Sequence, residues 1–404
     1  MDTVVVTVGR EVLSGKTVNT NLRDIAMMLS EIGLEITKSF VIDDSIEEYH
    51  KILDVIDEEL VIFTGGLGPT VDDLTREAVY SYYGLETYID EEVLSVIKEY
   101  FDRRKQPMTS ANRKQAMFPV GGRILQNDLG TAPGVCFDVD DQHIVLLPGP
   151  PREMKPMLKE VIQYLKQEVG VKLFSEGFKL VGTGESAMEE RLLGFYEQHP
   201  MVRIAPYASL GEIKYIFTSS DQEALKKARD HFYQKFSEYV YGSTEETLES
   251  VLVSLLKKKG KVVATAESCT GGLLASRITS VSGSSNVFKE GIVTYSNEAK
   301  MKYLEVNKET LDTFGAVSEE CVKEMSEQLL RRSNADYAIA ISGIAGPTGG
   351  SEEKPVGLVY FSLTTRQKTI LDKQVFNGNR TMVQRRAAIY AMNMLRKEII
   401  NVQN

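Results

Sequence analysis

The sequence predicts an α/β protein with three regions, and two patterns support this. Strand-like and helix-like segments alternate along residues 1–170 and again along residues 246–404, as in a sheet with helices on both faces. Residues 171–245 instead combine a hairpin pattern with two helical segments, which indicates a small α+β domain. We therefore expect two three-layer α/β/α domains and, between them, a linker or dimerisation domain.

Composition narrows the class of protein. The 404 residues are 42% apolar and 26% charged, which is ordinary for a globular chain. No apolar run is long enough to cross a bilayer, and the N-terminus lacks the pattern of a signal peptide. The three cysteines are too far apart to indicate a disulfide framework or a cysteine zinc site. A net charge of −10 argues against direct nucleic-acid binding. We expect a cytoplasmic protein with no membrane partner.

The first region begins with a β-branched strand over residues 3–8 and a helix over 19–32. A second strand follows at 36–42, then a helix at 47–56 and a third strand at 60–63. This order predicts a mostly parallel sheet, and ligands bind such sheets at the carboxyl ends of the strands. The loops that follow the strands are therefore the places to search for a site.

Three of these loops are rich in glycine, proline or polar residues, and they cover residues 9–21, 64–73 and 148–153. Glycines let backbone N–H groups approach phosphate oxygens closely. We expect a phosphate-containing nucleotide here. The candidate nucleotide-binding residues are Glu11, Asn21, Gly65, Gly66, Gly68, Gly149 and Arg152.

Two adjacent carboxylates, Asp72 and Asp73, follow the second of these loops. They could hold a divalent cation such as Mg²⁺, Mn²⁺ or Co²⁺ against the phosphate. The alternative is that they only cap the next helix, which acidic residues commonly do.

The motifs at 64–70, 127–134 and 147–153 resemble the N-terminal domain of the CinA family. This resemblance implies a fold like that of molybdopterin-binding proteins and, in some members, a metal-dependent pyrophosphatase that acts on ADP-ribose. One position departs from the family pattern. The first loop reads Gly9-Arg10-Glu11 where relatives usually have Asp or Thr in the middle, so Arg10 changes the local charge.

The third region is organised around residues 266–272, which contain Ser268 at a bend. A β-branched segment at 261–265 precedes this turn, and apolar residues at helical spacing follow it. The first N–H groups of a helix lack intrahelical partners, so a hydroxyl at this place lies next to donors for an oxyanion. The alternative is that Ser268 or Thr270 serves only as a helix N-cap.

A serine nucleophile needs a base, and all four histidines lie before position 232. A histidine from this region is therefore excluded, and a lysine with a lowered pKa is the remaining choice. Lys289 and Lys300 lie close to the same strand. Lys300 is preferred because it falls in the first turn of a helix, where the helix dipole disfavours a cation.

The motifs at 266–272, 293–300, 315–318 and 341–357 resemble the C-terminal domain of the same family. Standalone relatives of this domain are nicotinamide-nucleotide amidohydrolases, which convert nicotinamide mononucleotide to its acid and release ammonia. The resemblance implies a homodimer and an amidohydrolase without cofactor. It also implies Ser268 as nucleophile, Lys300 as base and Tyr295 as an orienting or relaying group.

The same resemblance suggests oxyanion donors and substrate-binding residues at Cys269, Thr270, Gly271, Ser342, Gly343, Gly349, Gly350, Ser351, Lys354 and Arg380. After Arg380, family members often have two adjacent arginines where this chain has Gln384-Arg385.

Two other functions remain open at this stage. The chain could be a competence- or DNA-damage-linked binding protein with idle catalytic sites, and Arg10 is the feature that favours this. Residues 1–170 could instead bind molybdopterin, an idea that depends on fold analogy alone.

Overall fold

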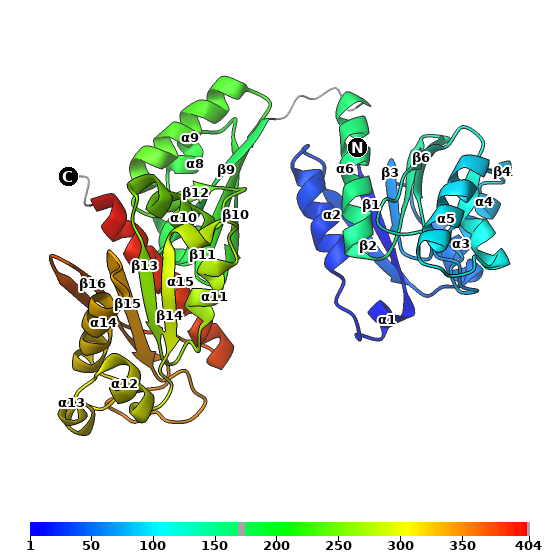
Figure 1. Ribbon diagram of the computed structural model, residues 1–404. Helices are drawn as coiled ribbons and strands as arrows, with labels where there is room; N and C mark the ends of the chain where they lie inside the picture. Colours follow the sequence, from blue (N-terminus) through cyan, green and yellow to red (C-terminus); the bar gives the residue numbers. More distant parts are fainter. Residues whose placement is uncertain (169–173, 402–404) are drawn as a thin grey trace. The chain divides into compact units, whose positions relative to one another are not determined.

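The computed structural model describes residues 1–168 and 174–401 (Figure 1). The chain forms two compact units, Met1–Ser175 and Glu176–Asn404. The residues expected as separate middle and C-terminal domains, 171–245 and 246–404, thus fall mostly within the second unit. Among the described residues, no helix is long and apolar enough to span a membrane.

The first unit is built on a six-stranded sheet in the order β2-β1-β3-β8-β7-β6. Its strands are β1 (Thr3–Val8), β2 (Ile36–Ile42), β3 (Leu60–Thr64), β6 (Arg123–Leu125), β7 (Gly134–Val139) and β8 (Gln142–Leu147). Strands β2, β1, β3 and β8 are parallel to one another. At the β8 edge, β7 pairs antiparallel with β8, and β6 pairs antiparallel with β7. A separate two-stranded ribbon joins β4 (Thr87–Ile89) and β5 (Met117–Pro119).

Helices cover both faces of this sheet, as the sequence pattern predicts. Alternate residues of β1 point to opposite faces, so Val5 packs against one helical layer and its neighbours against the other. One layer contains α2 (Thr20–Ser30) and α6 (Pro151–Glu168), and the other contains α3 (Ile46–Leu53), α4 (Thr75–Tyr82) and α5 (Glu91–Arg103). The short helices α1 (Arg10–Leu13) and η1 (Ser110–Ala116) lie in the loops between these elements.

The second unit contains two sheets. The smaller one has the order β10-β11-β9-β12, from β9 (Phe174–Val181), β10 (Arg203–Ser209), β11 (Glu212–Ser219) and β12 (Val240–Ser243). The hairpin expected in this region is β10–β11. The accompanying helices are α7 (Glu185–Leu192), α8 (Phe195–Gln198) and α9 (Gln222–Phe236).

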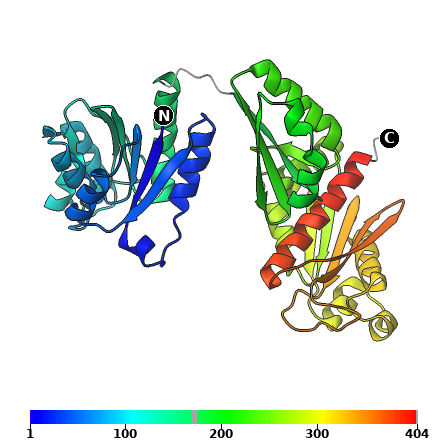
Figure 2. The ribbon, with the colours of Figure 1, turned by 180° about the vertical axis from the view of Figure 1, so that it is seen from behind.

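The larger sheet of this unit has the order β14-β13-β15-β16-β17. Strands β13 (Val263–Glu267), β14 (Phe288–Val293) and β15 (Tyr337–Gly343) are parallel to one another. Strand β16 (Leu358–Thr365) pairs antiparallel with β15, and β17 (Thr369–Val375) pairs antiparallel with β16. The helices are α10 (Leu248–Lys259), α11 (Leu273–Thr279), η2 (Ser284–Asn286), α12 (Asn297–Leu304), α13 (Lys308–Thr313), α14 (Glu319–Ser333) and α15 (Arg380–Asn401). Figure 2 shows α15, in red, along one face of this sheet.

The two sheets of the second unit are joined through a shared core. Val181 and Tyr241 of the smaller sheet pack in one cluster with α10, α11 and α15. The buried guanidinium of Arg396 on α15 donates to the carbonyl of Val240 at 3.1 Å. Helix α15 therefore contacts the smaller sheet near its C-terminal end, while its N-terminal end lies beside the loops described next.

Candidate functional site

The turn that contains Ser268 begins directly after β13. The preceding residue, Glu267, is 1% exposed. Its carboxylate accepts hydrogen bonds from the backbone N–H groups of Gly272, Leu274 and Ala275. Glu267, rather than Ser268 or Thr270, therefore satisfies the start of α11. The helix-cap alternative for Ser268 is wrong, because another side chain already performs that task.

Ser268 and Lys300 meet as the sequence predicts. Lys300 Nζ lies 3.0 Å from Ser268 Oγ and 2.7 Å from the carbonyl oxygen of Thr294. Ser268 is 8% exposed and Lys300 is 1% exposed. The parallel pairing of β13 with β14 brings the two residues together, because the ends of both strands lie at the same edge of the sheet.

Burial lowers the pKa of Lys300, because removing the ammonium from water penalises its charged form. The thiols of Cys321 and Cys269 are groups whose negative charge would act in the opposite direction. Burial raises their own pKa values to about 11 and about 12, so both are neutral near pH 7. No anion from these two residues then offsets the desolvation of the lysine at that pH.

Among the described residues, the Tyr295 side chain makes no hydrogen bond to Ser268 or Lys300. Its side chain is 60% exposed, and its hydroxyl accepts a hydrogen bond from the guanidinium of Arg380. Arg380 also donates to the carbonyl oxygen of Gly346 at 2.9 Å. The first residue of α15 thereby joins the loops after β14 and β15.

Other predicted residues of this region shape the surrounding loops. Ser342 is buried and donates to the carbonyl of Ala316 at 2.6 Å, so it holds a loop instead of facing solvent. Lys354 donates to the carbonyl of Phe314 at 2.7 Å. Gly343 and Gly350 pack tightly, because a Cβ there would meet backbone atoms at 2.6 and 2.7 Å. The Ser351 backbone N–H donates to the Lys354 carbonyl oxygen. Gly349 and Gly271 have positive φ angles, in the left-handed region that glycine favours.

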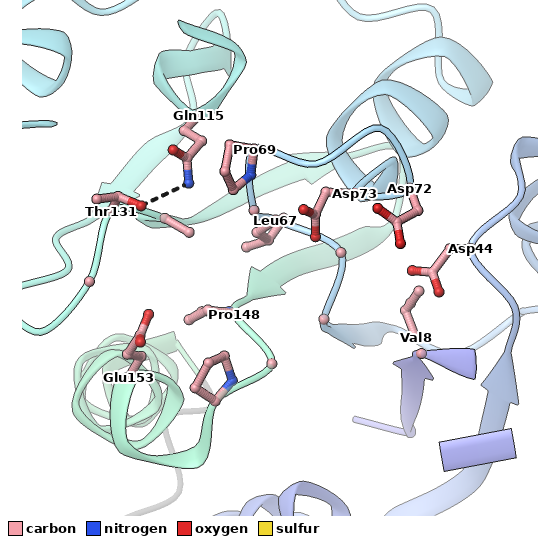
Figure 3. Close-up of a pocket in the computed structure, with 18 of the residues that line it drawn as sticks. Val8, Asp44, Leu67, Pro69, Asp72, Asp73, Gln115, Thr131, Pro148 and Glu153 are labelled. Atoms are coloured by element: carbon pink, nitrogen blue, oxygen red, sulfur yellow. Dashed lines mark hydrogen bonds between the residues drawn. The ribbon is translucent and has the colours of Figure 1, made fainter. Parts of the chain in front are cut away.

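A second candidate site occupies the first unit (Figure 3). A cavity of about 410 Å³ is lined by the glycine-rich loop and by the carboxylates of Glu11, Asp44, Asp72, Asp73 and Glu153. The Thr70 hydroxyl donates to both Asp72 and Asp73, which keeps these two carboxylates close. Within the described residues, no three His, Cys, Asp or Glu side chains are arranged to hold a metal ion. Two carboxylates remain a usual set for Mg²⁺ when phosphate oxygens complete its shell.

Asp44 was not expected from the sequence. Burial raises its pKa to about 6, and the charges of Asp72, Asp43 and Glu11 add to this effect. Asp44 is next to a serine that caps α3 and belongs to no glycine-rich motif, so only its position after β2 could have indicated it. Glu153 lies within the motif at 147–153 but was not among the candidate residues, because its contacts are with the distant loop that contains Asn127 and Gly130.

The remaining residues predicted for this site differ in their placement. Asn21 Nδ2 donates to Thr64 Oγ1 at 2.8 Å and to the Gly149 carbonyl at 2.7 Å, so it ties two of the loops together. Gly65, Gly66 and Gly68 line the cavity, and a Cβ at each would clash with its surroundings. Arg152 is largely exposed, 3.6 Å from Glu153, and does not line the cavity. Arg10 is exposed and also lies outside the lining.

Comparisons with known proteins match both the N-terminal and the C-terminal part of the chain. Residues 4–167 match the model of the family described as "Probable molybdopterin binding domain", and residues 245–399 match that of the CinA C-terminal domain. A CinA-like protein of Kosmotoga olearia is 41% identical over 99% of both chains. A competence-damage inducible protein of Caldicellulosiruptor saccharolyticus is 42% identical over 98% of this chain and 99% of its own.

A solved structure, the competence/damage inducible protein of Agrobacterium tumefaciens, is 42% identical. It covers 37% of this chain and 92% of its own, with a TM-score of 0.37. The full-length sequence relatives determine the assignment, because they share more than a third of their residues with this chain over nearly all of its length. The chain belongs to the CinA family.

Proposed function

We propose that residues 246–404 hydrolyse the carboxamide of nicotinamide mononucleotide to the acid and ammonia by a serine–lysine mechanism. The observation that supports this most is the 3.0 Å separation between Ser268 Oγ and Lys300 Nζ, with the lysine buried and its pKa lowered. A neutral amine at this distance can accept the hydroxyl proton.

In this mechanism the Ser268 oxygen attacks the carboxamide carbon while its proton moves to Lys300. Backbone N–H groups after Ser268 stabilise the oxyanion. Lys300 returns the proton to the departing nitrogen, and ammonia leaves. Water then hydrolyses the seryl ester with Lys300 again as base. The Thr294 carbonyl keeps Nζ in place throughout, because it accepts one of its N–H groups.

The test is ammonia release from nicotinamide mononucleotide by the intact protein, with a chelator present. We expect activity in the parent and a loss of about 10²–10⁴-fold in Lys300→Met, the usual contribution of a general base. Ser268→Ala should lose at least as much. Lys302→Met, on the same helix, is the matched control and should retain activity. No ammonia from the folded parent would exclude this substrate.

For the first unit we propose a second activity, metal-dependent hydrolysis of a nucleoside diphosphate such as ADP-ribose. The acidic cavity with its glycine-rich loop favours this. Asp72 and Asp73 would hold the divalent cation, which would neutralise phosphate charge and orient the substrate.

Asn substitutions at Asp72 and Asp73 test this second activity. The double variant should lose metal-dependent cleavage of ADP-ribose, because amides bind Mg²⁺ more weakly than carboxylates. Asp140→Asn, in a turn outside the cavity lining, is the control. Cleavage at the parent rate by the double variant would remove the metal role from these residues.

A further inference from the structure

The turn that follows β13 leaves a backbone donor free next to Ser268. The Gly271 N–H donates to the Ser268 carbonyl at 3.1 Å, so Cys269 and Thr270 are the two central residues of a tight turn. In the part of the chain that the structure describes, the Thr270 N–H has no hydrogen-bond partner. An unpaired donor two residues after the nucleophile is suited to an oxyanion.

A distant side chain determines where this donor points. Gln384, in the second turn of α15, donates through Nε2 to the Cys269 carbonyl oxygen at 2.8 Å. The Cys269 carbonyl and the Thr270 N–H belong to one planar trans peptide and point in opposite directions. The amide of Gln384 therefore holds the carbonyl on the α15 side and directs the N–H away from α15.

This peptide is the part of a tight turn that rotates most easily. Type I and type II turns differ mainly by a half-rotation of the peptide between the two central residues. The rotated form would need a positive φ angle at Thr270. Thr270 does not have a positive φ here, and β-branched residues disfavour it. Thr270 thus resists a full flip, and Gln384 limits the smaller rotations that remain. Its hydrogen bond also polarises the peptide and strengthens the N–H as a donor.

We infer that Gln384 is a positioning residue for the Ser268 reaction, in that it orients the Cys269–Thr270 peptide so that the Thr270 N–H meets the developing oxyanion. This inference rests on the proposed acyl-transfer function, because only such a reaction needs an oxyanion donor here. It adds a role for α15, a helix far from Ser268 in the sequence.

A fluorophosphonate probe tests this independently of the natural substrate. Ser268 Oγ forms a bond to phosphorus as the P–F bond breaks, fluoride leaves, and the hydroxyl proton passes to Lys300. The phosphoryl oxygen then occupies the place of the oxyanion. Gln384→Met and Gln384→Glu both remove the N–H donor while keeping the length of the side chain. Arg385→Met, at the adjacent exposed position, is the matched control.

We expect both Gln384 variants to react with the probe about 10- to 100-fold more slowly, as for a group displaced by about 1 Å, and the control to react at the parent rate. With nicotinamide mononucleotide, kcat should fall by a similar factor while KM stays unchanged. If Gln384 had only a structural role, its substitution would lower the unfolding temperature, and kcat would not fall selectively while KM stays unchanged.

Reaction of the folded Gln384→Met and Gln384→Glu proteins at the parent rate would overturn the inference. So would a parent whose Ser268 fails to react with the probe. A parent that reacts with the probe but releases no ammonia from nicotinamide mononucleotide would overturn only the choice of substrate, and the probe rates would still decide the role of Gln384.

Discussion

Lys300 lies in the interior with its amine between Ser268 Oγ and the Thr294 carbonyl oxygen. A lysine in water is protonated at neutral pH and cannot accept a proton. Burial lowers the pKa of Lys300 and so increases the share of its neutral amine at a given pH, and the two thiols nearby are neutral near pH 7. In the proposed mechanism, desolvation rather than a partner carboxylate is what makes Lys300 a base.

This origin of the base predicts the pH dependence of the reaction. Lys300 is active when neutral, so kcat/KM should rise with pH and level off above a pKa lower than the ordinary lysine value of 10.5. A pH–rate profile for ammonia release measures that pKa. A profile that falls over the same range, or that still rises steeply beyond pH 10.5, would contradict the role of Lys300 as base.

At the scale of single residues, the sequence allowed Ser268 and Lys300 to be predicted, because both lie in contiguous motifs next to strands. It did not indicate a role for Glu267, Asp44 or Gln384. The role of each of these depends on a contact formed in the folded chain. Gln384, for example, reaches a carbonyl 115 residues earlier. Such contacts have no local pattern in the sequence.

At the scale of elements, the short helix α11 depends on a single carboxylate. Glu267 accepts N–H groups from Gly272, Leu274 and Ala275, and it is itself the last residue of β13. Strand and helix are therefore joined by a side chain as well as by the turn. The position of Ser268, the first residue after the strand, follows from this connection.

Replacing Glu267 with Gln should destabilise the second unit by about 1–3 kcal/mol, because buried N–H groups lose a charged acceptor. Thermal unfolding followed by circular dichroism measures this effect. The control is Glu298→Gln, a fully exposed residue in the first turn of α12, which should change stability little. Equal stability of the two variants would show that the Glu267 carboxylate is dispensable.

Most elements were predicted from periodicity, and their bounds agree to within a few residues. The helix expected at 19–32 is Thr20–Ser30 with Asn19 as its cap, and the strand expected at 60–63 is Leu60–Thr64. Strand β17 was not predicted. Its residues are only partly buried and alternate poorly between apolar and polar, so its pairing with β16 is what makes it a strand.

At the scale of the whole molecule, the two candidate sites belong to separate compact units. The first has a cavity lined by carboxylates, and the second has a lysine–serine pair. In the proposed mechanisms only the first site uses a divalent cation. A chelator should therefore abolish ADP-ribose cleavage and leave ammonia release unchanged. Assays of both activities in one preparation, with and without added Mg²⁺, measure this. Loss of both activities on chelation would mean that the sites share a metal requirement.

Helix α15 also has a consequence for the order in which the protein is made. It is synthesised after Ser268 and Lys300, yet its first two turns contain Arg380 and Gln384, and its last turns hold the smaller sheet through Arg396. A nascent chain that has produced Ser268 and Lys300 still lacks the groups that orient their surroundings. We therefore expect the second unit to become competent only after α15 has been synthesised, and a premature stop codon before residue 380 should yield an inactive protein even though both proposed catalytic residues are present.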